Sequence, residues 1–319
     1  SSIPWKPLLI PSRLWTRPFF LRGEMPELPD ILLYVDALER YAKGLSVRKV
    51  VIYRPFLVRS VEPPVSEIVE KRLERIGRIG KRLVLSFSDD LHLILHLMIA
   101  GRLHWQAALP PRPSKIHQAA IDFGDGALVL TEAGTERRAS LHVVRGKAEF
   151  GEHDRGGIDP LSASAAEFEK ALRSENHTLK RALTEPRLFD GIGNAYSDEI
   201  LFAARLSPLR LSQSLSPEEM ERLRLATAET LRLWIDKLKV EFACKFPGTG
   251  DVTAFRPDFL VHGKYRQACQ VCGMPIQRIV YASNETNYCA RCQNEDRVLA
   301  DRALSRLLKE DWPRRIDDP

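Results

Sequence analysis

The spacing of apolar positions changes near the middle of the chain, and this change predicts two structural halves. After Pro26, apolar residues follow a helical period from residue 28 to 43, and Gly44 marks the end of that helix. Short apolar and β-branched runs come next, separated by turn signals such as Asp89-Asp90. These runs cover residues 47–53, 82–87, 91–97, 119–123, 127–130 and 140–144. The pattern predicts a leading helix followed by a β-sandwich.

Beyond Asp159-Pro160 the helical period returns, and it predicts helices at residues 165–173, 178–183, 194–204 and 217–240. We therefore expect an α+β multidomain chain. Its expected units are a β-sandwich domain at 25–158, a helical domain at 159–260, a small cysteine-bearing unit at 261–293 and a helical extension at 294–319.

Composition narrows the class of partner. Lys and Arg outnumber Asp and Glu by 48 to 42 in the 319 residues, giving a net charge of +6. This excess suits a polyanion such as nucleic acid, although a basic enzyme without such a partner also fits it. No apolar run approaches the ~20 residues of a membrane-spanning helix. Prolines interrupt any signal-peptide core in residues 1–24, which we interpret as a transit-like leader or a mis-assigned start, so the protein proper is expected to begin at Met25.

Four of the five cysteines form two C-x-x-C pairs, Cys269 with Cys272 and Cys289 with Cys292. This spacing predicts one structural zinc ion in a ribbon, because each pair aims two thiolates at one point. Protein ligands fill all four positions, so the metal would fold the ribbon and activate no water. A pair of redox motifs is the alternative, but no thioredoxin-like strand and helix accompany them. Metal spacing in place of a disulfide framework favours a reducing compartment.

The segment MPELPDILLYVDALERY, residues 25–41, resembles the start of the formamidopyrimidine-DNA glycosylase and endonuclease VIII family. The resemblance implies that the initiator Met is removed, that Pro26 becomes the catalytic nucleophile, and that Glu27 serves acid/base roles. Elementary chemistry agrees, because a terminal amine with a pKa of about 8 is more often unprotonated at neutral pH than a lysine at about 10.4. By itself, a proline before a helix is more often a helix-entry residue.

Two further segments, GRIGKRLVLSF and LHLILHLMIAGRL, fit the family at the expected distance from Pro26. The resemblance implies that Lys81 contacts a DNA phosphate beside the reaction centre and that His96 contacts another. It also places Ile99 where the family often carries a methionine that fills the space left by the flipped base. Without the resemblance, Lys81 would be interpreted as a solvated lysine and His96 as a core residue.

The segment NHTLKRALTEPRLFDGIGNAYSDEILFAA resembles the helix-two-turn-helix of the same family. Gly191 and Gly193 are expected to let the backbone approach DNA. Asn194 opens a helix whose exposed amides favour an anion, so we expect it to bind phosphate. Lys180 falls at a family lysine near the lesion pocket. A glycine turn that merely caps a helix is the alternative for such a motif.

The resemblance covers residues 25–293 and contains two departures. Arg138 matches an arginine that the family inserts into the opposing strand, but Ala139 stands where the accompanying aromatic residue is expected. Asn284 replaces the phosphate-binding arginine of the zinc hairpin, and Arg278 is a candidate to supply that charge. Both departures bear on lesion and opposite-base preference.

We interpret the chain as a monomeric bifunctional DNA glycosylase and abasic-site lyase that acts on damaged double-stranded DNA. Its expected compartment is the bacterial cytoplasm, with the nucleoid, or another reducing compartment that contains DNA. A catalytically inactive zinc-ribbon protein that binds damaged or distorted DNA is the main alternative, and a zinc-ribbon RNA-binding protein is a weaker one. The sequence leaves open whether the lesion is an oxidised purine, an oxidised pyrimidine, an abasic site or a crosslink.

Overall fold

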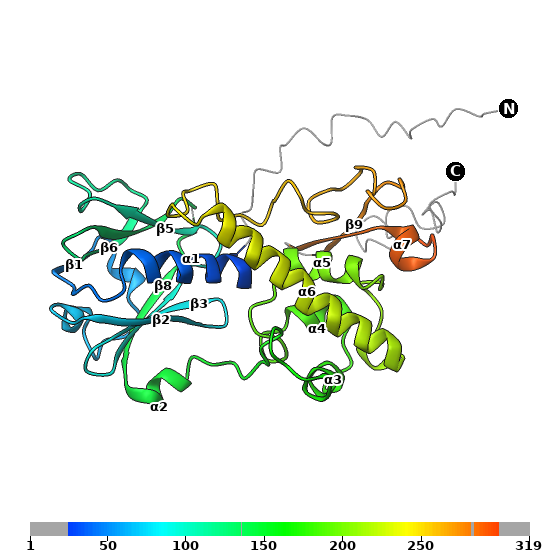
Figure 1. Ribbon diagram of the computed structural model, residues 1–319, viewed down its shortest axis with the longest axis horizontal. Helices are drawn as coiled ribbons and strands as arrows, with labels where there is room; N and C mark the ends of the chain where they lie inside the picture. Colours follow the sequence, from blue (N-terminus) through cyan, green and yellow to red (C-terminus); the bar gives the residue numbers. More distant parts are fainter. Residues whose placement is uncertain (1–24, 135, 282–283, 300–319) are drawn as a thin grey trace.

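A computed structural model describes residues 25–299 except residue 135 and residues 282–283. In it, a β-rich half and a helical half lie side by side; helix α1 lies over the β-rich half, and helix α6 crosses the helical half and reaches the boundary (Figure 1). The predicted leader and most of the predicted C-terminal extension lie outside the described residues. The α+β architecture with separate sandwich, helical and zinc-ribbon parts agrees with the sequence analysis.

Helix α1 (Leu28–Tyr41) starts where the sequence places a proline in its first turn. The backbone N–H of Glu27 donates to Asp30 Oδ2 at 3.0 Å, which satisfies a donor at the helix start. Gly44 adopts a φ of +84°, a conformation that ends the segment without strain because glycine has no Cβ.

The β-rich half is a sandwich of two antiparallel four-stranded sheets, ordered β1-β6-β7-β5 and β2-β3-β4-β8 among the described residues. Leu85, Leu93 and Leu130 are among the side chains that fill the space between the sheets. The strands are β1 (Lys49–Ile52), β2 (Leu73–Ile79), β3 (Arg82–Phe87), β4 (Leu91–His96), β5 (Gly101–Gln106), β6 (His117–Asp122), β7 (Ala127–Glu132) and β8 (Ser140–Arg145).

Strands β2 and β5 and the short helix α2 (Gly146–Gly151) were not predicted. Strand β2 buries Leu73, Ile76 and Ile79, at intervals of three residues, since its pairing with β3 is irregular between Leu73 and Arg75. The alternation that signals a strand is therefore lost. Strand β5 begins at a glycine, which weakens the strand signal there.

All four predicted helices of the second half are present, with boundaries within one residue. They are α3 (Ala165–Arg173), α4 (Leu179–Thr184), α5 (Asn194–Ala203) and α6 (Pro217–Glu241). Ser164 and Ser216 each open a helix with a reciprocal capping box, to Glu167 and Glu219. Local capping chemistry thus explains why the sequence marked these boundaries well. A hairpin of β9 (Gln277–Tyr281) and β10 (Asn284–Tyr288), then α7 (Ala290–Asn294), completes the described chain.

The two halves share residues across their boundary. Leu28 and Leu32 of α1 pack in the core of the helical half, whereas Ile31, Leu33, Tyr34 and Leu38 of the same helix pack in the sandwich core. Conversely, α6 contributes Leu223 and Trp234 to the helical core and Leu238 to the sandwich core. The N-terminal end of α1 is thereby fixed at the junction of the two halves.

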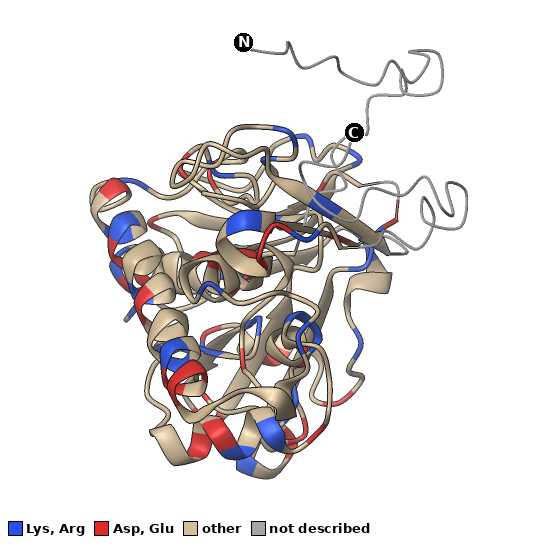
Figure 2. Ribbon diagram, turned by 90° about the vertical axis from the view of Figure 1, so that its right-hand side faces the viewer, with Lys and Arg blue, Asp and Glu red and all other residues tan. Residues whose placement is uncertain are grey.

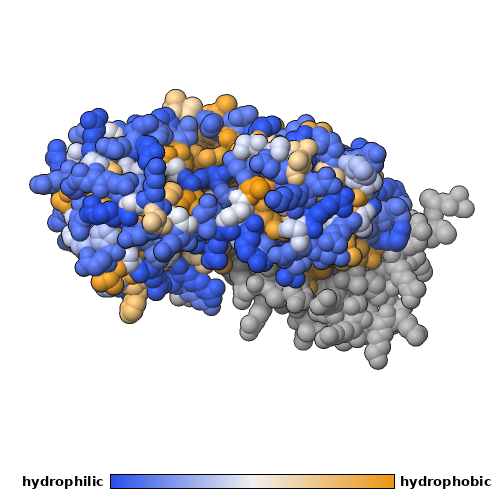
Figure 3. Space-filling model, turned by 90° about the horizontal axis from the view of Figure 1, so that it is seen from below, coloured by the Kyte–Doolittle hydropathy of each residue, from blue (hydrophilic) through white to orange (hydrophobic). Residues whose placement is uncertain are grey.

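Seen from below, the described surface is mostly hydrophilic with small, separate apolar patches (Figure 3). Among the described residues, no helix combines the length and the apolar character that crossing a membrane requires.

Candidate functional site

Pro26 and Glu27 are buried at this junction. The Glu27 carboxylate accepts hydrogen bonds from the backbone N–H groups of Gly193 at 2.6 Å, Ala195 at 2.8 Å and Tyr196 at 3.3 Å. It therefore occupies the positive N-terminal end of α5. These amides were expected to bind an anion such as phosphate, but the anion that they bind here is the Glu27 carboxylate of the same chain.

Lys81 lies in the two-residue turn between β2 and β3, after Gly80, whose φ is +59°. The Asp190 carboxylate accepts the Gly80 N–H at 3.3 Å and the Arg78 guanidinium at 2.5 Å, so this hairpin is attached to the helical half. A Cβ atom on Gly193 would lie 2.6 Å from Lys81 Nζ and 2.5 Å from Glu27 Cδ. Gly193 thus has a role that differs from the expected approach to DNA, because it leaves space for the lysine and the glutamate to converge.

His96, at the end of β4, pairs across the sheet with Arg82. Its Nε2 lies 3.3 Å from the sulfur of Met25. Burial, and next to it repulsion from Arg82, Lys81, Arg155 and His142, together lower the pKa of His96 to about 4. A neutral imidazole among basic side chains forms a site where a phosphate group would relieve the repulsion.

Two connections at the same end of the sandwich carry Ile99 and Arg138. Ile99 is exposed in the turn between β4 and β5, and the exposed Arg138 forms an ion pair with Glu136 at 2.6 Å. Ala139 is 4% exposed and packs into the sandwich core, while its N–H donates to Glu132 at 3.0 Å. The alanine at the expected aromatic position therefore offers no side chain to a ligand.

Lys180 and Asn194 lie on α4 and α5. Lys180 Nζ donates to the Asn194 carbonyl at 2.6 Å and to Asp198 at 2.5 Å. The Asn194 side chain donates to the carbonyl of Glu285 in the hairpin at 2.9 Å. These contacts give both residues a positioning role between α5 and the hairpin, and their contacts with DNA stay predictions.

Sequence reasoning missed the acidic pair Asp198 and Glu199, which is buried on α5. Asp198 Oδ2 accepts from His262 at 2.7 Å and from the Asn287 N–H at 3.0 Å. Glu199 accepts the N–H groups of residues 260–262 at 2.8 to 2.9 Å. Adjacent acids within an otherwise apolar helix were the available signal, because buried carboxylates require donors. The pair binds the helical domain to the metal-binding ribbon.

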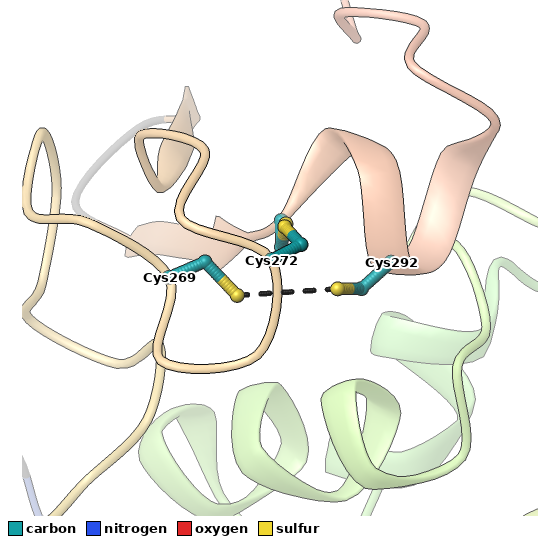
Figure 4. A group of neighbouring side chains, drawn as sticks. Cys269, Cys272 and Cys292 are labelled. Atoms are coloured by element: carbon teal, nitrogen blue, oxygen red, sulfur yellow. Dashed lines mark hydrogen bonds between the residues drawn. The ribbon is translucent and has the colours of Figure 1, made fainter.

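The four predicted ligands Cys269, Cys272, Cys289 and Cys292 come together, with all sulfurs within 4.8 Å of one another. Figure 4 shows Cys269 opposite Cys292, with their sulfurs 3.9 Å apart, and Cys272 beside them. Tetrahedral zinc with Zn–S bonds of about 2.3 Å requires sulfur separations of about 3.8 Å, so the cluster fits one structural zinc ion. Arg278 stacks on Tyr265 at 4.2 Å and pairs with Glu285 at 3.3 Å. Its replacement of the missing hairpin charge stays a prediction.

Basic and acidic residues are interspersed over the helical half (Figure 2), so net charge alone does not locate the binding surface. More distinctive are the cations around His96, the Pro26-Glu27 pair near them and the four-cysteine ribbon. Together with the fold, they define the class of zinc-containing DNA glycosylases.

Comparison with known proteins then gives the family. Three family descriptions match in order: the formamidopyrimidine-DNA glycosylase N-terminal domain at residues 25–136, its H2TH domain at 157–242, and the zinc finger found in FPG and IleRS at 266–294. The chain belongs to the formamidopyrimidine-DNA glycosylase family.

Individual relatives agree over nearly their whole length. The formamidopyrimidine-DNA glycosylase of Desulforamulus reducens is 32% identical over 84% of this chain and 99% of its own. That of Ureaplasma parvum is 29% identical over 85% and 100%. The structure of Lactococcus lactis Fpg with abasic-site DNA superposes with a TM-score of 0.75 and 25% identity, over 84% of this chain and 99% of that one.

Proposed function

We propose that this glycosylase removes a damaged, oxidised base from duplex DNA and then cleaves the strand, with the amine of Pro26 as its nucleophile. The observation that carries the proposal is the burial of Pro26 and Glu27 at the domain junction, where Lys81 and the cations around His96 meet. The target base must leave the stack, because its sugar C1′ is inaccessible inside a duplex.

The proposal requires Pro26 to be the first residue of the working protein. An amide nitrogen shares its lone pair with the carbonyl, so a proline within the chain cannot attack C1′. Removal of Met25 would free this amine. The sulfur of Met25 lies 3.3 Å from His96 Nε2. The new amine would therefore arise near Lys81 and Arg82, whose positive charges favour its neutral, nucleophilic form.

The reaction would then proceed as follows. The Pro26 nitrogen bonds to C1′ and gives up its proton, the glycosidic C–N bond breaks, and the base leaves with the bonding electrons and takes up a proton. Ring opening, with a proton added to the ring oxygen, gives an iminium ion. Loss of a C2′ proton expels the 3′ phosphate, and loss of a C4′ proton expels the 5′ phosphate. Water then hydrolyses the iminium ion, which releases the sugar fragment and restores the Pro26 amine. Glu27 would carry out these proton transfers, and phosphate contacts from Lys81, His96 and Arg138 would hold the strand in position.

Borohydride trapping tests the nucleophile. Protein expressed from Met25 and processed to Pro26 should form a covalent adduct with abasic-site DNA, and the adduct should map to Pro26. Pro26→Gly should keep some trapping, because glycine still provides a terminal amine. If protein retaining the residues before Pro26 traps and cleaves equally well, another amine is the nucleophile and the proposal fails.

Glu27 requires a separate test, because its carboxylate also caps α5. In Glu27→Gln, an amide group that donates would face backbone donors, so some loss of stability accompanies the chemical defect. We expect Glu27→Gln to bind DNA but process it about 100-fold or more slowly. Thermal unfolding of the same sample shows whether the variant is folded at the assay temperature. Normal processing by a folded variant would remove Glu27 from the mechanism.

We further propose that the protein works as a monomer in a DNA-containing, reducing compartment, where its thiolates stay available to zinc. No observation favours the inactive alternative, since the Pro26-Glu27 pair and its surroundings are intact. Excision assays on duplexes that contain an oxidised purine, an oxidised pyrimidine or a crosslink distinguish the lesion classes.

A further inference from the structure

The loop after β1 presents an unusual aromatic residue. Phe56 is 85% exposed and Val61 is 84% exposed, the two highest values among the large apolar side chains of the described residues. Leu57 is buried, and Pro55 opens the short helix η2 (Pro55–Leu57) that displays Phe56. Pro55 and the buried Leu57 fix the backbone on both sides of Phe56, so little backbone entropy remains to be lost when the ring contacts a partner.

This loop borders the end of the sandwich that carries the candidate site. Val58 pairs in parallel with Leu141, and the Arg59 N–H donates to the Leu141 carbonyl at 2.8 Å. Because the pairing is parallel, the residues before Val58 run beside the residues before Leu141, and these include Arg138. Phe56 thus belongs to the same end of the sandwich as the β7–β8 connection.

The turn with Ile99 is at this end as well. Gly101 pairs with Glu132 across β5 and β7, and a Cβ on Gly134 would lie 3.2 Å from Ala100. Three neighbouring connections therefore expose Phe56, Ile99 and Arg138.

The charge around the loop identifies the partner. Arg59 is exposed. The pKa of His142 is lowered by burial and, in decreasing order, by the charges of His153, Arg82 and Arg59. His142 in turn belongs to the basic group around His96. Residues 53–64 contain two arginines, Arg54 and Arg59, against one acid, the exposed Glu62. An exposed aromatic ring beside a group of cations matches nucleic acid, where bases stack on rings and phosphates pair with cations.

We propose that Phe56 stacks on a base of the strand opposite the lesion and so helps to keep the damaged site open. The proposal rests on the function proposed above, and it adds a contact for the undamaged strand. Ala139, buried in the sandwich core, cannot make such a contact, whereas Phe56 is exposed at the same end.

The test uses a duplex with a tetrahydrofuran abasic analogue and 2-aminopurine opposite it. Phe56→Ala should bind this duplex about 5- to 150-fold more weakly, the range measured for one base–aromatic stack, and should change 2-aminopurine fluorescence less than the unaltered protein. Phe56→Trp should restore both signals. Val240→Ala, which alters a comparably exposed apolar side chain on α6, is the matched control and should change neither.

Two results would overturn the proposal. In one, Phe56→Ala binds the duplex and perturbs 2-aminopurine as the unaltered protein does. In the other, sedimentation shows that the unaltered protein is a dimer and that only Phe56→Ala dissociates it into monomers, which would assign the ring to self-association. Borohydride trapping on single-stranded abasic DNA should be equal for both proteins, because no opposite strand is present. If neither protein traps, the proposed nucleophile fails, while the fluorescence measurement still decides the role of Phe56.

Discussion

The acid–base group on α5 (Asp198 with Lys180 and His262) and the end of the β-sandwich both contain charged groups, but their charges are compensated in different ways. In the α5 group, Asp198 accepts from Lys180, His262 and a backbone N–H, so its charge is matched inside the protein. At the sandwich end, burial and repulsion from Arg82, Lys81 and Arg155 keep a proton off His96. The α5 group is electrostatically complete by itself, whereas the sandwich end becomes complete when an anion binds.

This difference separates structural charges from functional ones. Changes in the α5 group should act on folding and zinc binding, and changes at the sandwich end should act on DNA affinity while leaving the fold intact.

Loss of zinc should have the largest effect. The protein should contain about one zinc ion per chain, and Cys272→Ala should lose it together with DNA binding, because three thiolates cannot fold the ribbon. Metal analysis and a DNA-binding titration measure the two quantities. Cys244→Ala, at an exposed cysteine apart from the cluster, should retain both. Full DNA binding by metal-free protein would show that the ribbon is dispensable.

Asp198→Ala should destabilise the protein by about 3–5 kcal/mol, because it leaves the Lys180 ammonium buried without its carboxylate. Chemical unfolding measures the change. Asp258→Ala removes an acid from an exposed ion pair with Lys237 and should change stability by less than about 1 kcal/mol. Equal effects of the two variants would contradict the structural role assigned to the α5 group.

Lys81→Ala should weaken binding to damaged and undamaged duplex alike and lower the salt dependence of affinity by about one unit. Stability should change little. The measurement is a titration at several salt concentrations, with Lys239→Ala on α6 as the control for a general loss of charge. A variant that loses affinity for damaged DNA alone would place Lys81 in the lesion pocket instead.

His96 should produce the smallest effect, a dependence on pH. Its pKa of about 4 lies below the ordinary value of 6.5, so its contribution to stability is complete above pH 6.5 and is lost as the pH falls towards 4. A bound phosphate would raise this pKa, so DNA binding should take up as much as about one proton in that window. His96→Gln should flatten both profiles. Unchanged profiles would mean that another group titrates there.

Much of this molecule was predictable because its signals are local. The apolar period marked the helices, two of which Ser164 and Ser216 cap locally, and the C-x-x-C pairs fixed all four zinc ligands before the fold was known. The resemblance supplied Pro26 and Glu27, which the structure places together with Lys81.

The remaining features depend on contacts between distant segments. Glu27 reaches amides of α5 that lie 166 or more residues away along the chain, and no local pattern indicates this pairing. The irregular pairing of β2 hides its alternation, and the neighbourhood of Phe56 and Arg138 depends on a single parallel pairing between β8 and a loop.

The sharing of α1 and α6 between the two cores also bears on the order of synthesis. The carbonyls of Phe242 and Ala243, just past α6, accept hydrogen bonds from Arg40 of α1. A ribosome releases α1 long before α5 and α6, so a growing chain can hold Pro26 and Glu27 without the helices that position them. The nucleophile would then be aligned only after the helical half has emerged and folded, which delays activity until the protein is nearly complete.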